Sequence, residues 1–102
     1  MENLKILVLD DERVFRDEIK EFLETDGFDV HLAAKPSEAF DILKLTEIDI
    51  IILDLKLPEM DGITVLQKVK ELYPEIEVIM ITGHGDMDAV IQAMRYGAVE
   101  FF

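Results

Sequence analysis

The sequence predicts an α/β fold, a doubly wound parallel sheet with helices between successive strands. Short apolar runs rich in β-branched residues alternate with stretches whose apolar residues recur at helical spacing. The apolar runs are nearly continuous, as in parallel strands that are buried on both faces. Glycine and proline mark the boundaries between them. With 102 residues, of which 50% are hydrophobic and 32% charged, the chain is expected to form one domain over residues 1–102.

The first strand and helix are predicted from the N-terminal quarter of the chain. Residues 5–9 form a short apolar strand. A helix follows, because the next apolar residues recur at helical spacing. They are Val14, Phe15, Ile19, Phe22 and Leu23. Gly27 supplies the stop, since glycine readily adopts the conformation that ends helices.

A strand, a helix and a strand are predicted next, over residues 28–54. The strand covers residues 28–32, and Pro36 can open the helix because proline fits the first helical turn. The apolar positions of this helix are Ala39, Ile42, Leu43 and Leu45. The third strand is the apolar run 48–53, which ends at Asp54.

The second half of the chain continues the alternation. Pro58 and Gly62 break the chain after Asp54, and a third helix then ends before Pro74. Its apolar positions are Ile63, Leu66, Val69 and Leu72. A fourth strand over residues 76–81 leads through a loop to a fourth helix marked by Met87, Val90, Ile91 and Met94. A fifth strand is predicted over residues 98–102, which gives the pattern (βα)4β.

Acidic residues end two of the predicted strands. Asp10 and Asp11 follow the first strand, and Asp54 follows the third. Because parallel strands of an open sheet place their carboxyl ends at one edge, we expect the three carboxylates to meet there. Their mutual repulsion favours a bound proton or a cation, and Mg²⁺ suits such an open cluster of oxygen ligands. A carboxylate beside Mg²⁺ can attack phosphorus and form an acyl phosphate, and Asp54 is placed for that role.

A simpler interpretation is that these acids only cap strand ends and helix starts. Asp11, for example, could cap the helix that begins near Glu12. Two separate strands that both end in acids favour a shared site instead. Thr82 ends the fourth strand, so its hydroxyl could donate to a phosphoryl oxygen, with Gly83 leaving room for the approach. Thr82 could also be a helix cap or loop hydroxyl, although Asp86 is the better-placed cap.

Composition excludes several classes of partner and site. Twenty-three acidic against ten basic residues give a formal charge of −13, which disfavours direct binding to nucleic acid or to an anionic membrane. Cysteine is absent, so disulfides, thiolate metal sites and cysteine nucleophiles are excluded. The N-terminus has no signal-peptide pattern, and no apolar run approaches the roughly 18 residues of a membrane span. We therefore expect a cytoplasmic protein.

Four motifs together resemble the receiver domain of bacterial two-component response regulators, the CheY-like domain. They are Leu9-Asp10-Asp11-Glu12, Asp54-Leu55-Lys56-Leu57-Pro58-Glu59-Met60-Asp61-Gly62, Thr82-Gly83-His84-Gly85 and Gly97-Ala98-Val99-Glu100-Phe101-Phe102. The resemblance spans essentially the whole chain. It implies a flavodoxin-like sheet with strand order 2-1-3-4-5.

The resemblance also implies the chemistry of the acidic site. Asp54 would be the phosphoacceptor, taking a phosphoryl group from a histidine kinase in a phosphorelay. Asp11, Asp54 and the main-chain carbonyl of Lys56 would bind Mg²⁺ directly. Asp10 would act on the ion largely through a water molecule.

A switch is implied by the same resemblance. Thr82 would move toward the phosphoryl oxygens, and Phe101 would change its burial as the aromatic partner of that movement. Lys56 and His84 flank the pocket and would tune the lifetime of the phosphoryl group. The changed surface would then act on a downstream output domain or protein.

The family normally continues, about two positions past Phe102, with a lysine, a proline and a fifth helix, which this sequence lacks. That lysine contacts the phosphorylated site, so its loss affects switching more than metal binding. The missing helix would cover one face of the sheet. We therefore expect either self-association through the uncovered face or a trimmed version of a longer protein.

Two other functions compete with a receiver that is not a turnover enzyme. One is a Mg²⁺-dependent phosphatase with an aspartyl nucleophile. Such enzymes of the haloacid dehalogenase type usually carry a second aspartate two positions after the first, where this chain has Lys56. The other is a dimerisation or interaction fragment that is silent to phosphorylation.

Overall fold

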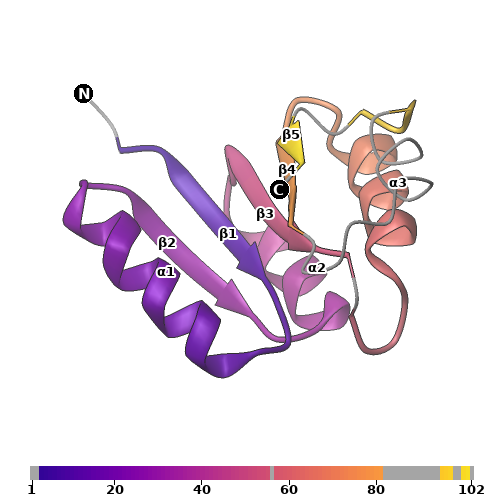
Figure 1. Cartoon of the computed structure of the whole chain (residues 1–102). Coiled ribbons are helices and arrows are strands. Elements are labelled where there is room, and N and C mark those ends of the chain that lie inside the picture. The colour runs from indigo at the N-terminus through magenta and orange to yellow at the C-terminus, as the bar shows by residue number, and fades with distance from the viewer. Residues whose placement is uncertain (1–2, 56, 82–94, 98–99, 102) are drawn as a thin grey trace.

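Five parallel strands form one sheet in the order β2-β1-β3-β4-β5, as predicted (Figure 1). The computed structural model describes residues 3–55, 57–81, 95–97 and 100–101. The strands are β1 (Lys5–Leu9), β2 (Asp29–Ala33), β3 (Ile50–Asp54), β4 (Glu77–Ile81) and β5 (Glu100–Phe101). The first half of the chain thus supplies one edge and the centre of the sheet, and the second half adds β4 and β5 beside β3.

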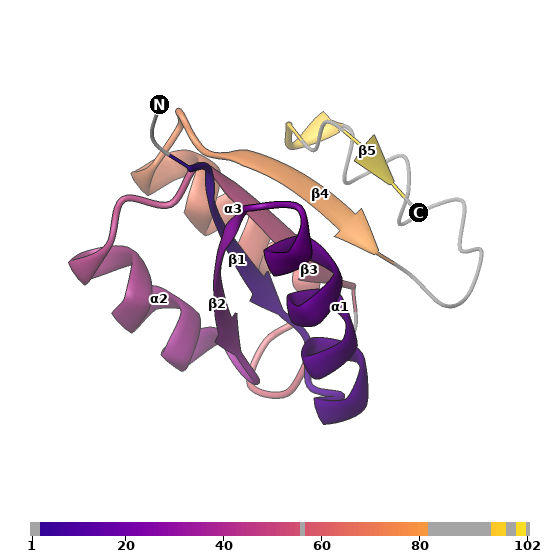
Figure 2. The same ribbon diagram turned by 90° about the vertical axis from the view of Figure 1, so that its left-hand side faces the viewer.

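Helices cover both faces of this sheet (Figure 2). They are α1 (Arg13–Thr25), α2 (Pro36–Leu45) and α3 (Gly62–Leu72). Apolar residues of α2 and α3 pack with one face of the strands, and those of α1 pack with the other. The predicted fourth helix lies in residues outside the described part of the chain. Within the described part, no helix is long and apolar enough to cross a membrane.

Alternation along each central strand divides the core into two clusters. In β1, Leu7 and Leu9 face α2 and α3, whereas Ile6 and Val8 face α1. Leu53 of β3 belongs to the first cluster and is fully buried. Because successive strand residues point to opposite faces, both faces must be apolar, which explains the continuous apolar runs.

Three strand boundaries differ from the prediction by one or two residues. β2 is shifted by one residue from the predicted 28–32, and β4 begins one residue later than predicted. β3 begins at Ile50 instead of residue 48, because the ladder with β1 pairs Ile50 with Ile6. Asp49 still contacts β1, since its carboxylate accepts a hydrogen bond from the Lys5 N–H at 2.9 Å. The described part of the fifth strand is shorter than the predicted one.

Two of the apolar residues that predicted α1 are exposed. Val14 is 62% exposed and Phe22 is 69% exposed, although both lie within the predicted helix. The helix instead directs Phe15, Ile19 and Leu23 toward the sheet. These three lie four residues apart, whereas each exposed residue immediately precedes one of them and is rotated by about 100° around the helix.

The two leucines of α3 differ sharply in burial. Leu66 is fully buried between the helix and the sheet, whereas Leu72 at the end of the helix is 63% exposed. Leu45 at the end of α2 is 88% exposed. The apolar spacing therefore predicted the extent of both helices correctly, but their last apolar residues do not pack in the core.

We predict that Leu66→Ala lowers the free energy of unfolding by about 2–5 kcal/mol, because it leaves a cavity in the core. Leu72→Ala is the matched control on the same helix, and it should change the free energy of unfolding by less than about 0.5 kcal/mol. Urea denaturation followed by circular dichroism measures both. Equal losses in the two variants would contradict the assigned orientation of α3.

Candidate metal centre

The pairing of β1 with β3 brings the predicted acids together. The two strands are neighbours, and Leu9 is the register partner of Leu53. Asp10, which follows β1, and Asp54, the last residue of β3, therefore lie side by side at the carboxyl edge of the sheet. Carboxylate oxygens of Asp10, Asp11 and Asp54 all lie within 4.8 Å of one another. The predicted meeting of the three carboxylates is confirmed.

The three acids differ in their contact with solvent. Asp10 is only 7% exposed, Asp54 is half-buried and Asp11 is exposed. The cluster is thus buried on the side of Asp10 and open on the side of Asp11. A divalent ion that keeps several water molecules requires an open side of this kind.

Asp10 is held in one orientation by its neighbours. Its Oδ1 accepts a hydrogen bond from the Glu12 N–H at 2.8 Å, and its main-chain carbonyl accepts one from Nη1 of Arg16 at 2.8 Å. Burial raises the pKa of Asp10 above its usual value, and the charges of Asp11 and Glu12 raise it further. The Glu12 N–H and the Arg16 charge oppose that rise in pKa.

The interpretation of these acids as simple caps explains little of this arrangement. The N-cap residue of α1 is Glu12, and no side chain makes a capping hydrogen bond there, so the possible capping role of Asp11 is wrong. Asp10 does close a turn by accepting from Glu12, but that contact uses only one of its carboxylate oxygens. The clustering of the three acids therefore needs another explanation.

The donor set fits a hard divalent cation such as Mg²⁺. Three carboxylates placed within 4.8 Å repel one another, and one of them is buried. A cation placed among them relieves both the repulsion and the cost of burying Asp10. Magnesium prefers oxygen ligands and commonly takes one or two carboxylates together with water.

The loop between β3 and α3 folds back onto the main chain of Asp54. The N–H of Gly62 donates to the carbonyl of Leu55 at 2.8 Å, and a Cβ on Gly62 would overlap the main-chain oxygen of Asp54. Glycine is required here by this close approach. Asp61 caps α3, since its Oδ1 accepts a hydrogen bond from the Thr64 N–H at 2.8 Å.

Glu59 makes a contact that the sequence did not reveal. Its carboxylate accepts hydrogen bonds from the N–H of Ser37 at 2.9 Å and from the Ser37 hydroxyl at 3.1 Å. Its φ of 70° is in the left-handed region, which is costly for a residue with a side chain. Lys35, the N-cap residue of α2, has no side-chain capping bond, so Glu59 satisfies donors at that helix start from a distant loop.

Four predicted site residues cannot be placed by their side chains. Lys56, Thr82 and His84 lie outside the described residues, as does the side chain of Phe101. The main chain of Phe101 belongs to β5, where Phe101 is the register partner of Met80. The roles of these four residues stay predictions.

Comparison with known proteins agrees with the geometry. Residues 6–102 match the family model of the response regulator receiver domain. The chain is 34% identical over 102 residues to sporulation initiation phosphotransferase F of Bacillus subtilis, which covers 100% of this chain and 82% of the relative. It is also 37% identical over 103 residues to an NtrX-like response regulator of Rickettsia typhi. That alignment covers 99% of this chain but only 22% of the longer protein.

A solved structure extends the likeness. The response regulator from Burkholderia pseudomallei, crystallised with a phosphorylated aspartic acid, a calcium ion and citrate, superposes with a TM-score of 0.90. It is 26% identical to this chain, and the superposition covers 97% of this chain and 58% of that one. With an acidic cluster at the carboxyl edge of a β2-β1-β3-β4-β5 sheet and a family match over residues 6–102, this chain belongs to the receiver domains of two-component response regulators.

Proposed function

We propose that Asp54 accepts a phosphoryl group from a histidine kinase, in a reaction that requires Mg²⁺. The observation that carries this proposal is the convergence of Asp10, Asp11 and Asp54 within 4.8 Å at the carboxyl edge of the sheet. The phosphorylated aspartic acid and calcium ion of the Burkholderia pseudomallei structure support it, because that protein shares the fold. Asp54 is only half-buried, so a donor can approach it from solvent.

The transfer is a displacement at phosphorus. A carboxylate oxygen of Asp54 forms a bond to the phosphorus atom, and the bond from phosphorus to the imidazole nitrogen of the kinase breaks. The electron pair of that bond stays on the imidazole, which takes up a proton, and Asp54 becomes an acyl phosphate. Bound Mg²⁺ would supply positive charge that offsets the charge of the phosphoryl oxygens.

The acidic neighbours of Asp54 would hold the ion. We assign Asp11 and Asp54, with the main-chain carbonyl of Lys56, as direct ligands, and Asp10 as a ligand through water. The burial of Asp10 and its hydrogen bond from Glu12 support a fixed position for its carboxylate. The hydrogen bond from Gly62 to Leu55 supports a fixed position for Leu55, which precedes Lys56 in the sequence.

The remaining residues would report and time the phosphorylation. β4 ends at Ile81, the register partner of Asp54 at the carboxyl edge of the sheet, and Thr82 is the next residue in the sequence. We propose that Thr82 binds the phosphoryl oxygens, that Phe101 responds to it, and that Lys56 and His84 set the phosphoryl lifetime. The receiver would act in the cytoplasm on a downstream output domain or protein, without turnover of a substrate. Self-association through the sheet face that is expected to lie uncovered also stays a prediction.

Phosphorylation is tested by incubating the chain with Mg²⁺ and acetyl phosphate and measuring its intact mass. We expect a gain of one phosphoryl group, which Asp54→Asn should abolish because an amide cannot attack phosphorus. Asp41→Asn, on the exposed surface of α2, is the matched control and should be phosphorylated normally. An adduct that survives in Asp54→Asn would refute the assignment, and repeated turnover of a phosphate ester would favour the phosphatase interpretation.

Magnesium binding is tested by calorimetry on the same chain. Asp11→Asn should weaken the affinity for Mg²⁺ by about tenfold or more, because it removes one charge placed within several ångströms of the ion. Asp61→Asn is the control, since asparagine still caps α3 and Asp61 lies outside the cluster. Equal affinity in Asp11→Asn and the unaltered chain would remove Asp11 from the proposed ligands.

The raised pKa of Asp10 makes its effect on stability depend on pH. The folded chain binds this proton more tightly than the unfolded chain does. The contribution of Asp10 to the free energy of unfolding is therefore fully present below the ordinary pKa of 3.8 and is lost as the pH rises through the folded pKa. Asp10→Asn keeps an oxygen acceptor for Glu12 and carries no charge, so without Mg²⁺ it should be more stable than the unaltered chain at neutral pH.

The difference in free energy of unfolding between Asp10→Asn and the unaltered chain should shrink as the pH falls below the pKa of Asp10 in the folded chain. Urea denaturation at several pH values measures this difference. Saturating Mg²⁺ should also reduce it, because an ion that binds only the folded chain stabilises that chain. If Asp10→Asn is instead less stable at neutral pH without Mg²⁺, burial is not the main influence on the pKa of the Asp10 carboxylate.

A further inference from the structure

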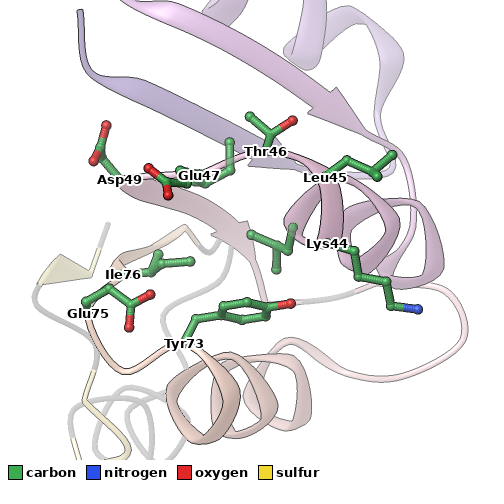
Figure 3. A pocket seen from close by; sticks show the side chains of 10 residues that line it. Lys44, Leu45, Thr46, Glu47, Asp49, Tyr73, Glu75 and Ile76 are labelled. Atoms are coloured by element: carbon green, nitrogen blue, oxygen red, sulfur yellow. The ribbon is translucent and has the colours of Figure 1, made fainter. Parts of the chain in front are cut away.

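A second feature of the molecule is a hollow of about 440 Å³ at the amino edge of the sheet, opposite the acidic cluster (Figure 3). One wall is formed by the end of α2 and the segment that enters β3. The other wall is formed by the segment that joins α3 to β4. β3 spans the five residues between the two sites, which separates them by about 16 Å at roughly 3.3 Å per residue.

The floor of this hollow is apolar. Leu43, Ile48 and Ile76 line it and are buried, with 3–6% of their surface exposed. Tyr73 is half-buried in the wall, and Leu45 is 88% exposed at the rim. A leucine exposed beside an apolar floor offers surface that an apolar side chain from outside can cover.

The charges around the hollow are separated into two ends. Figure 3 shows the carboxylates of Glu47, Asp49 and Glu75 at one end, and Lys44 with the hydroxyl of Tyr73 at the other. Asp49 is partly engaged, because its Oδ2 accepts a hydrogen bond from the Lys5 N–H. Glu47 and Glu75 are exposed on opposite walls.

Helix polarity adds to the negative charge at this edge. α2 ends at Leu45 and α3 ends at Leu72, so the carboxyl ends of both helices lie beside the hollow. The carboxyl end of a helix carries a partial negative charge and favours a cation nearby. This effect and the two glutamates both select positive charge on an occupant.

The wall from α3 to β4 is fixed by hydrogen bonds of its own. Nζ of Lys70 donates to the carbonyl of Ile76 at 2.7 Å, and the N–H of Tyr73 donates to the carbonyl of Val69 at 2.7 Å. Ile76 in turn donates its N–H to the carbonyl of Tyr73 at 3.1 Å. A wall that is already ordered loses little conformational entropy when a partner binds.

We propose that this hollow binds an extended segment of another protein, in which a lysine or arginine is followed by an apolar residue and then by an acidic one. The cation would lie between Glu47 and Glu75, the apolar side chain would cover the floor beside Leu45, and the acid would approach Lys44. Charge complementarity favours this occupant over a second copy of the chain, because copies that each carry −13 repel one another. The contact is independent of the proposed phosphorylation, because the hollow contains none of the residues assigned to Asp54 chemistry.

The proposal is tested by titrating the ¹⁵N-labelled chain with the acetylated, amidated peptide Lys-Arg-Leu-Phe-Ser-Glu and following amide shifts by NMR. We expect the shifts to centre on residues 43–49 and 73–76. The peptide with its charges reversed, Glu-Glu-Leu-Phe-Ser-Lys, should produce much smaller shifts. Shifts centred elsewhere, or equal shifts with both peptides, would overturn the proposal.

A charge-reversed variant sharpens the test. The double substitution Glu47→Lys with Glu75→Lys should weaken peptide binding by about fivefold or more, because it replaces attraction with repulsion at exposed positions. Glu18→Lys with Glu21→Lys on α1 makes the same change of charge away from the hollow and should leave the affinity unchanged. Unchanged affinity in the first variant would exclude the hollow as the binding site.

Two further readouts identify other outcomes. Beryllofluoride with Mg²⁺ should leave peptide affinity unchanged, and a loss of affinity on its addition would contradict the proposed independence. Sedimentation of the chain without peptide tests a second copy as the occupant. Self-association that disappears in the Glu47→Lys, Glu75→Lys variant would replace the protein partner with that copy.

Discussion

The pairing of β1 with β3 is the contact on which the rest of the structure depends. Leu7 and Leu9 face α2 and α3 on one side of the sheet, while Val8 faces α1 on the other. Because side chains alternate along a strand, a slip of one residue would exchange these faces and bury the wrong set. The register that satisfies both cores also pairs Leu9 with Leu53 and so places Asp10 beside Asp54. The hydrophobic packing of the two cores thus also fixes the positions of the acidic residues.

Burying the Asp10 carboxylate beside other acids costs free energy, and nearby contacts reduce that cost. Asp10 is buried beside other carboxylates, which raises its pKa, yet it receives a hydrogen bond from Glu12 while Arg16 binds its main chain. Each contact offsets part of the desolvation without pairing the charge completely. A bound cation would offset the rest of this cost. Functional sites often need buried charges that the fold itself does not need, and such charges lower the stability of the protein.

Much of this arrangement could be predicted from the sequence, because buried parallel strands are continuous apolar runs and their carboxyl ends share an edge. Burial on the helices was harder to predict. Val14 and Phe22 are as apolar as Phe15, and only the position of α1 over the sheet exposes them. The contact of Glu59 with Ser37 joins residues 22 positions apart, and it depends on a left-handed backbone at Glu59. No local pattern indicates a contact of that kind.

The two edges of the sheet have opposite electrical characters for one reason. Strands that run parallel are joined by helices that run back, so helix amino ends gather at the carboxyl edge of the sheet and helix carboxyl ends gather at the amino edge. The start of α3 lies beside Asp54, where a phosphoryl group would benefit from partial positive charge. The ends of α2 and α3 flank the hollow, where Glu47 and Glu75 add full negative charges to partial ones. The same topology therefore favours an anion at the carboxyl edge and a cation at the amino edge, where the hollow lies.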